Sequence, residues 1–204
     1  MVLNLTMAGS QNRVRLPPLD EHEWSPTTRA RLLDSWLPAT QAPPKPSSVR
    51  ATLARHETLF EAWDAFGAAI FNGALPERDR EVLILRTAWL TQCRVQWAYH
   101  EAPAARAGLT DSDIDAIVEG PDSTALEAWD RVLVTVVDQL RENGTIDDAT
   151  WDVLAARYTT EQLIEIPLVA GHYLMIAFAV NSFGTPVPEG SAALPSPRGR
   201  RADR

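Results

Sequence analysis

The chain has 204 residues and a formal net charge of −8 at pH 7, with 45% hydrophobic and 23% charged residues. These values suit one globular domain with a substantial core and terminal extensions, and the acidic balance argues against nucleic acid as the main partner. Lys45 is the only lysine and Cys93 the only cysteine. Schiff-base chemistry is therefore disfavoured, and intrachain disulfides and cysteine-rich metal sites are excluded.

The first 47 residues are expected to lie outside the main domain. Residues 1–20 predict an extended arm, and they lack the sustained apolar stretch of a secretory signal. Ser25 followed by Pro26 predicts a capped helix that runs to about Trp36. The proline-rich segment that follows, up to residue 47, predicts a stiff linker, because clustered prolines do not sustain a helix.

Residues 48–190 carry helical signals throughout, and no stretch shows the clean apolar–polar alternation of a strand. The fold class is therefore predicted as all-α, a compact oligomeric domain of about seven to eight helices. Asp113 and Thr110 form a capping-box-like helix start. Residues 191–204 predict a disordered basic tail. Helices are expected over residues 48–71, 77–90, 92–107, from 110 onward, 123–143, 147–157 and 160–183.

The longest apolar run, residues 166–180, is interrupted by Pro167, Gly171, His172 and Tyr173. It is predicted to be too short and too polar to span a bilayer, which favours a soluble cytoplasmic protein with no membrane partner. Because the segment is apolar nearly all round, it must be buried on most sides. In a domain of this size, part of that burial is expected to come from another copy of the chain.

The most informative pattern joins Glu81, Cys93, Gln96 and His100 in the spacing E-x11-C-x2-Q-x3-H. Positions 93, 96 and 100 recur at helical spacing and share one helix face. Glu81 lies on the preceding predicted helix, from which a chain reversal can return it to the cluster. A thiol, an amide, an imidazole and a carboxylate can thus converge, as proton transfer or thiol chemistry requires.

Cys93 is expected in the first turn of the helix over residues 92–107, with Thr91 as its N-cap. There the unpaired amides and the helix dipole would lower the pKa of the thiol, and Arg94 adds a neighbouring positive charge. The four histidines show no metal-ligand spacing. We therefore expect no metal and no other cofactor.

The motif and its surroundings resemble the alkylhydroperoxidase-D and carboxymuconolactone decarboxylase superfamily, over LPERDREVLILRTAWLTQCRVQWAYHEAPAARAGLTDSDIDAIVEG. A second segment, residues 171–190, resembles the C-terminal end of a long branch of that superfamily, and it reads GHYLMIAFAVNSFGTPVPEG. The resemblance covers roughly residues 48–190. It implies a helical homo-oligomer (dimer, trimer or hexamer) with its site near a subunit interface, and it implies that Glu81, Cys93 and His100 are catalytic.

The departures from the superfamily pattern concern position 96. The redox members carry a second cysteine where Gln96 stands, which forms a disulfide with the first; with Cys93 alone that cycle is impossible here. The decarboxylases resemble the chain at His100, but they usually carry a carboxylate at position 96 and lack the pair of Glu81 and Cys93. The chain therefore fits neither activity fully.

Each motif residue also has a structural interpretation. Cys93 and His100 can be ordinary core side chains, and Glu81 can pair with a neighbouring arginine. Gln96 can simply join two helices by hydrogen bonds. The spacing that unites the four residues is the reason to prefer a functional site.

Four further residues are candidates for substrate binding. Trp97 neighbours Gln96, although packing is the alternative for its large ring. His172, Tyr173 and Asn181 are polar groups within an otherwise apolar segment. Because buried polar groups need partners, these three either line a pocket or form structural hydrogen bonds.

Three functions remain open, each with a small molecule as the ligand. The first is an enzyme that transfers protons on an organic acid, lactone or related metabolite, with His100 as acid or base and Glu81 as its partner. In it, Cys93 and Gln96 would hold a substrate oxygen. The second is a one-cysteine peroxidase, in which the Cys93 thiolate attacks a hydroperoxide and an external thiol restores it. The third is a non-catalytic helical binding protein.

Overall fold

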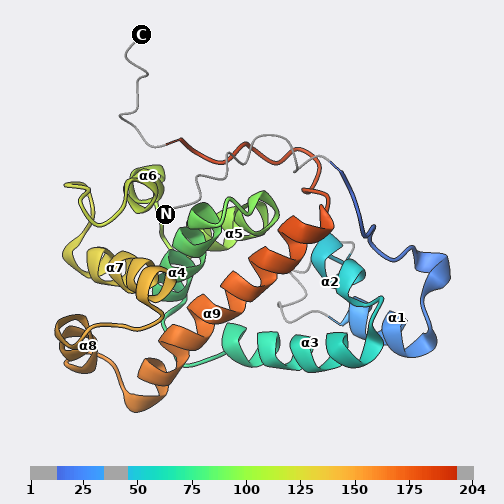
Figure 1. Ribbon diagram of the computed structural model, residues 1–204, viewed down its shortest axis with the longest axis horizontal. Coiled ribbons are helices and arrows are strands. Elements are labelled where there is room, and N and C mark those ends of the chain that lie inside the picture. The colour runs from blue at the N-terminus through green and yellow to red at the C-terminus, as the bar shows by residue number, and fades with distance from the viewer. Residues whose placement is uncertain (1–12, 35–45, 197–204) are drawn as a thin grey trace, which may run out of the picture.

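The computed structural model describes residues 13–34 and 46–196, and within them every regular element is helical. The predicted all-α class is therefore confirmed (Figure 1). Of the nine α-helices in these residues, eight lie within 48–190. The elements are the 3-10 helix η1 (Glu21–Glu23), α1 (Pro26–Leu33), α2 (Ser48–Leu53), α3 (Glu57–Phe71), α4 (Glu77–Leu90), α5 (Arg94–Arg106), α6 (Asp111–Glu119), α7 (Ala128–Asn143), α8 (Asp148–Ala155) and α9 (Thr160–Phe183).

Helix α4 is the central helix of the domain (Figure 1). Every residue from Asp79 to Ala88 is buried, because α5, α7 and α9 all pack against it. The buried charge of Arg86 is compensated by Asp138, whose carboxylate oxygens accept two hydrogen bonds of 2.7 Å. A helix without a solvent face can place charged groups deep in the domain only when each has such a partner.

Most of the predicted helices are confirmed, with differences at their ends. α9 has the predicted bounds and continues through Pro167, and α6 begins with the predicted capping box. The expected helix over residues 48–71 is divided into α2 and α3. The division falls at His56, because its side chain accepts a hydrogen bond from the Leu59 amide and so starts α3. α7 begins at Ala128, later than the predicted residue 123.

Both ends of the described chain pack on the helical domain. The amides of Arg15 and Leu16 donate to the carbonyl of Phe183 at the end of α9. There Gly184 has a φ of 66°, and a Cβ on it would lie 2.1 Å from the Arg13 carbonyl oxygen, so only glycine fits. After α9 the chain passes α4, where the Trp89 indole donates to the carbonyl of residue 195.

The described chain between residues 191 and 196 therefore contacts the helical domain. Leu194 packs against the main core in this stretch. Most of the predicted linker, and residues 197–204 of the predicted tail, lie outside the described residues.

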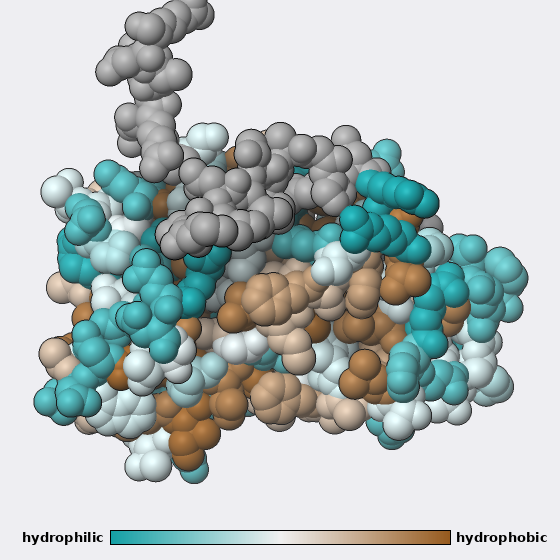
Figure 2. All heavy atoms as spheres, viewed as in Figure 1, coloured by the Kyte–Doolittle hydropathy of each residue, from teal (hydrophilic) through white to brown (hydrophobic). Residues whose placement is uncertain are grey.

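α9 is covered only in part within a single chain. The helix has 24 residues and is long and apolar enough to cross a membrane by length and composition, with 44% of its most apolar window buried in the fold. The apolar run of residues 166–180 lies inside this longer helix. Four large side chains stand exposed along it, namely Ile164, Leu168, Met175 and Phe178. Figure 2 shows hydrophobic residues along the course of α9 on this face.

Candidate active site

Glu81 and His100 form the best-defined contact of the predicted motif. The Oε2 atom of Glu81 lies 2.8 Å from Nδ1 of His100, which joins α4 to α5. The Glu81 side chain is 0% exposed, whereas the His100 side chain keeps 12% exposure. A carboxylate in this position accepts the proton of Nδ1 and leaves Nε2 with its lone pair. Glu81 thus orients the His100 ring, whose side chain remains partly exposed.

Cys93 precedes α5 and is its N-cap, so the prediction that it lies in the first turn is wrong by one position. Thr91 is instead the C-cap of α4. Between them Gln92 adopts a left-handed conformation with a φ of 53°, which turns the chain sharply from α4 into α5. Non-glycine residues adopt this conformation at a small cost in free energy.

Burial, not the helix start, determines the pKa of Cys93. The thiol is 0% exposed, and it packs with Ile176, Ala177 and Val180 of α9. Burial raises the pKa of Cys93 to about 11, and the backbone amides of Gln96 and Val95 lower it only in part. The prediction of a lowered pKa is therefore wrong, because desolvation of the thiolate exceeds the effect of the amides. At neutral pH Cys93 is a thiol.

Several buried polar atoms near the pair have no hydrogen-bond partner within the described part of the chain. They include Oε1 of Glu81, both amide atoms of Gln96 and Nδ1 of His172. Gln96 lies one helical turn before His100 and is 4% exposed. An unsatisfied buried group costs about 1–3 kcal/mol, so such groups in a native fold call for a ligand or another explanation.

His172 and Tyr173 approach the pair from α9. The Tyr173 ring meets the His100 ring edge-on, with centroids 5.0 Å apart, and the His172 ring meets Tyr173 in the same way at 5.3 Å. Burial lowers the pKa of His172 to about 4, and His100 adds a smaller effect in the same direction. Burial, followed by the charge of Glu81, raises the pKa of Tyr173. Both rings are therefore neutral at pH 7.

Trp97 and Asn181 are engaged in structural contacts. Trp97 is 2% exposed and belongs to the main core, and its indole nitrogen donates to Glu101 at 3.0 Å. The Asn181 amide donates to the carbonyl of Thr91 at 2.9 Å, which ties the end of α9 to the end of α4. The structure gathers Glu81, His100 and Tyr173 through direct contacts, whereas the hydrogen bonds of Trp97 and Asn181 go to other residues.

Two residues next to the site were not anticipated. Arg80 is buried beside Glu81, with Nε 3.7 Å from Oε1 of that carboxylate. The ring of Trp63, from α3, stacks on His172 with centroids 5.8 Å apart. Arg80 is one of several charged residues in α4, and its position directly before Glu81 is the sequence signal that could have identified it. Trp63 comes from a distant helix and leaves no such signal.

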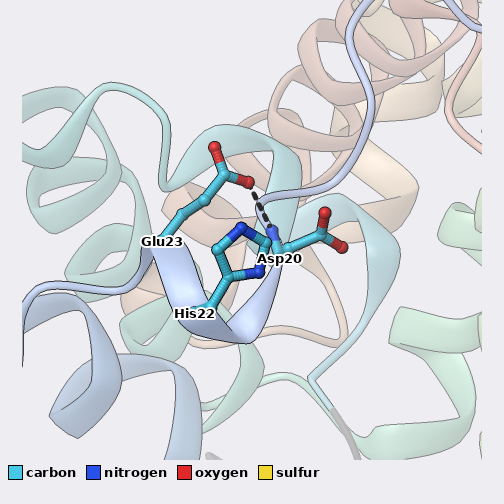
Figure 3. A group of neighbouring side chains, drawn as sticks. All are labelled: Asp20, His22 and Glu23. Carbon is cyan, nitrogen blue, oxygen red and sulfur yellow. Dashed lines mark hydrogen bonds between the residues drawn. The ribbon is translucent and has the colours of Figure 1, made fainter.

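Two other features lie away from this cluster. Asp20, His22 and Glu23 are exposed neighbours in and before η1 (Figure 3). The Glu23 carboxylate accepts a hydrogen bond from the Asp20 amide at 2.9 Å, so it acts as a helix cap. A hollow of about 120 Å³ between α4, α7 and α9 is lined mainly by apolar side chains, and none of the predicted site residues contributes to it.

Comparisons with known proteins agree on the fold, and one family model matches the central part of the chain. The sequence profile of the Carboxymuconolactone decarboxylase family matches residues 57–142, which include Glu81, Cys93, Gln96 and His100. No curated protein sequence matches the chain.

Among solved structures, an alkylhydroperoxidase AhpD core protein from Ralstonia eutropha JMP134, described as peroxidase-related, is similar with a TM-score of 0.73 at 17% identity over 86% of this chain and 92% of that one. The debrominase Bmp8 is similar with a TM-score of 0.66 at 14% identity over 87% and 94%. A cysteine-to-alanine variant of Bmp8 in complex with 2,3,4-tribromopyrrole gives 0.57 at 16% over 93% and 96%. At these identities the structures show a common fold.

Proposed function

We propose that the chain is a cytoplasmic enzyme of the carboxymuconolactone decarboxylase and AhpD-like superfamily, and that it transfers protons on a small organic acid or lactone-like metabolite. The observation that supports this function best is the 2.8 Å contact between the buried carboxylate of Glu81 and Nδ1 of His100. A histidine that is held by a carboxylate and keeps one accessible nitrogen is suited to general acid–base catalysis near neutral pH.

In the proposed reaction, Nε2 of His100 removes a proton from a carbon atom next to a carbonyl group. The electron pair of the broken C–H bond moves onto the carbonyl oxygen and gives an enolate. Glu81 stabilises the imidazolium that forms. In an isomerisation, the imidazolium then returns the proton to another carbon of the enolate. In a decarboxylation, the bond to a carboxylate breaks in place of the C–H bond, and its electron pair gives the enolate as carbon dioxide leaves. The enolate carbon then takes a proton from an imidazolium that His100 forms by taking up a proton from water.

Gln96 and Cys93 are proposed to hold the substrate oxygen. The Gln96 amide nitrogen is a buried donor without a partner among the described residues, and the neutral Cys93 thiol is a weak donor. Donors that are already in place where negative charge develops lower the barrier to enolate formation. His172 and Tyr173 would border the ring or chain of the substrate. The debrominase, which has the same fold, binds a small planar ring, and this supports a substrate of similar size.

The peroxidase alternative is weaker, because it needs a thiolate at Cys93. With a pKa raised to about 11, the resting thiol is protonated, and no second cysteine is present to resolve a sulfenic acid. A binding protein without turnover would not need a carboxylate–imidazole pair.

The test is proton exchange at carbon in heavy water. A panel of oxo acids and unsaturated lactone acids is incubated with the protein, and loss of the carbon-bound proton signal is followed by NMR. Wild type should exchange at least one class of compound, and His100→Gln should lose about 100-fold or more of the rate. Cys93→Ser should keep most of it. His22→Gln, an exposed histidine far from the site, is the matched control.

Two outcomes would contradict the proposal. If exchange persists in His100→Gln, the imidazole is not the base. If exchange is absent while Cys93-dependent loss of a hydroperoxide is present, the protein is a one-cysteine peroxidase.

We also propose that the exposed face of α9 is covered by a second copy of the chain. Ile164, Leu168, Gly171, Met175 and Phe178 follow one another at intervals of four and three residues, which is the spacing of a helix–helix seam. A Cβ atom added to Gly171 would have no neighbouring atom within 4 Å. Another helix can therefore approach closely at this position. Two α9 helices related by a two-fold axis would bury this seam against itself.

Light scattering coupled to size exclusion tests the second copy. Phe178→Glu should convert the oligomer into a monomer, because it places a charge in the seam. Trp151→Glu, at an exposed aromatic residue on α8, is the control and should leave the mass unchanged. A wild-type protein that is monomeric, or that floats with lipid vesicles, would refute the proposal.

A further inference from the structure

Arg80 is a buried cation next to the Glu81–His100 pair. Its side chain is 6% exposed, and its Nε lies 3.7 Å from Oε1 of Glu81. The guanidinium carbon lies 4.6 Å from the centre of the Phe71 ring. Phe71 is the last residue of α3, so the guanidinium group lies over the end of that helix. Nε has no hydrogen-bond partner in the described segments. The contact with Glu81 is therefore mainly one of charge, and the aromatic face supports the cation.

Glu81 is placed between two groups that can be positive. Its Oε1 faces Arg80 and its Oε2 contacts His100, and its side chain is 0% exposed. A buried cluster is most stable when its charges add up to zero, because any net charge there is poorly solvated. With Arg80 present, the neutral total is reached when Glu81 is a carboxylate and His100 carries no charge.

Without the guanidinium the balance changes. A buried carboxylate with no other cation draws a proton into the pair, and that proton resides on His100 or on Glu81 itself. In either case the pair already holds the proton that it is proposed to accept from the substrate.

The other titratable groups that face the pair do not replace Arg80. Tyr173 and His172 approach from α9, and Cys93, the N-cap of α5, stands seven residues before His100. Burial raises the pKa values of Tyr173 and Cys93 and lowers that of His172, so all three are neutral at pH 7. Among these groups, Arg80 supplies the charge that balances Glu81.

We infer that Arg80 is a positioning residue for the proposed proton transfer: it balances the buried carboxylate of Glu81 and so keeps the His100 imidazole neutral and able to accept a proton. This inference rests on the proposed function, in which His100 is the base. It concerns the protonation of His100, which can be measured without a substrate.

The experiment is a pH titration of the histidine ring signals by NMR on the full chain. With four histidines in the sequence, the His100 signals are assigned from their absence in His100→Gln. In Arg80→Met, which removes the charge and keeps an apolar stem over Phe71, the titration midpoint of His100 should move upward by about one pH unit or more. Arg80→Lys keeps the charge and should stay close to wild type.

Arg94→Met is the matched control, because Arg94 is exposed and adjacent to Cys93. It removes the same charge from solvent and should leave the His100 midpoint unchanged. An unchanged midpoint in Arg80→Met would overturn the inference. An equal shift in Arg80→Met and Arg80→Lys would also overturn it, because a residue that acts only by packing would not respond to whether the substitute carries a charge.

A second measurement tests the inference if Arg80→Met folds too poorly for the NMR titration. Unfolding in urea is compared for Arg80→Met, Glu81→Gln and the double variant. If Arg80 acts through the carboxylate, Arg80→Met should lower the urea midpoint much less when Glu81 is already glutamine. An equal loss in both backgrounds would mean that Arg80 acts independently of Glu81. Neither result depends on the carbon-exchange assay, so failure of this inference and failure of the proposed function are distinguishable.

Discussion

The reactivity of Cys93 is the most direct test of how the site works. Burial raises the pKa of its thiol to about 11, compared with 9.0 for an unperturbed cysteine. A difference of about two units lowers the thiolate fraction about 100-fold near neutral pH. The thiol is also 0% exposed, so a reagent has to wait for local opening. About 100-fold is therefore the smallest slowing that we expect for alkylation of the native protein relative to the unfolded chain.

Intact mass spectrometry with iodoacetamide measures this directly, because the chain has a single cysteine. The alkylation rate of the native protein should keep rising as the pH increases beyond 9. The alkylation rate in concentrated urea should level off once the pH passes about 9. A hydroperoxide with a sulfenic-acid trap should give no rapid adduct. A native rate that levels off below pH 8, or that equals the unfolded rate, would refute the argument that burial exceeds the effect of the helix amides.

The same shift has a consequence for stability. The fold favours the neutral thiol, and the unfolded chain loses this proton first as the pH rises through about 9. The stabilisation from the protonated thiol is therefore complete below the unfolded pKa and is lost between pH 9 and about 11. It amounts to at most about 3 kcal/mol. Cys93→Ala should remove this alkaline dependence from urea unfolding curves.

Three further predictions follow from other buried groups. Burial lowers the pKa of His172 to about 4, so stability should fall as the pH drops from 6.5 towards 4, and His172→Phe should flatten that slope in urea unfolding. Arg86→Met leaves the Asp138 carboxylate without its partner and should cost about 3–5 kcal/mol, measured in the same way; Arg94→Met should cost little. Gln96→Cys should form a disulfide with Cys93 under mild oxidation, detected as a loss of two thiols, because residues 93 and 96 share a helix start; a pair that never oxidises would contradict that geometry.

Local sequence signals predicted the helices, and distant contacts account for most of the differences. The start of α6 was predictable because Thr110 and Asp113 cap each other within four residues. The division between α2 and α3 was not, because histidine is an uncommon N-cap, and the N-terminal segment also contacts this region. Leu19 donates to the Ala51 carbonyl, and the Arg55 guanidinium donates to the carbonyl of residue 17. Such contacts between distant segments have no periodicity of their own.

The same contrast holds for the site. The pairing of Glu81 with His100 was predictable, because two adjacent helices and a tight turn bring the positions together. The state of the thiol was not. The amides that lower its pKa lie within three residues of Cys93, whereas the side chains that bury it come from α9, more than 80 residues later in the chain. The sequence around Cys93 therefore contains the weaker effect on its pKa, and the stronger one comes from a distant helix.

The difference in exposure between the two candidate reactive groups favours imidazole chemistry. A substrate has to touch the atom that reacts, and the His100 side chain keeps 12% exposure while Cys93 has none. The thiol would need both deprotonation and a local opening of α9 before it could attack, and each of these is unfavourable at neutral pH. His100 needs neither, because Glu81 already orients its ring. With Gln96 at the position of a second cysteine, a reaction at the imidazole uses every group of the motif as it stands in the fold.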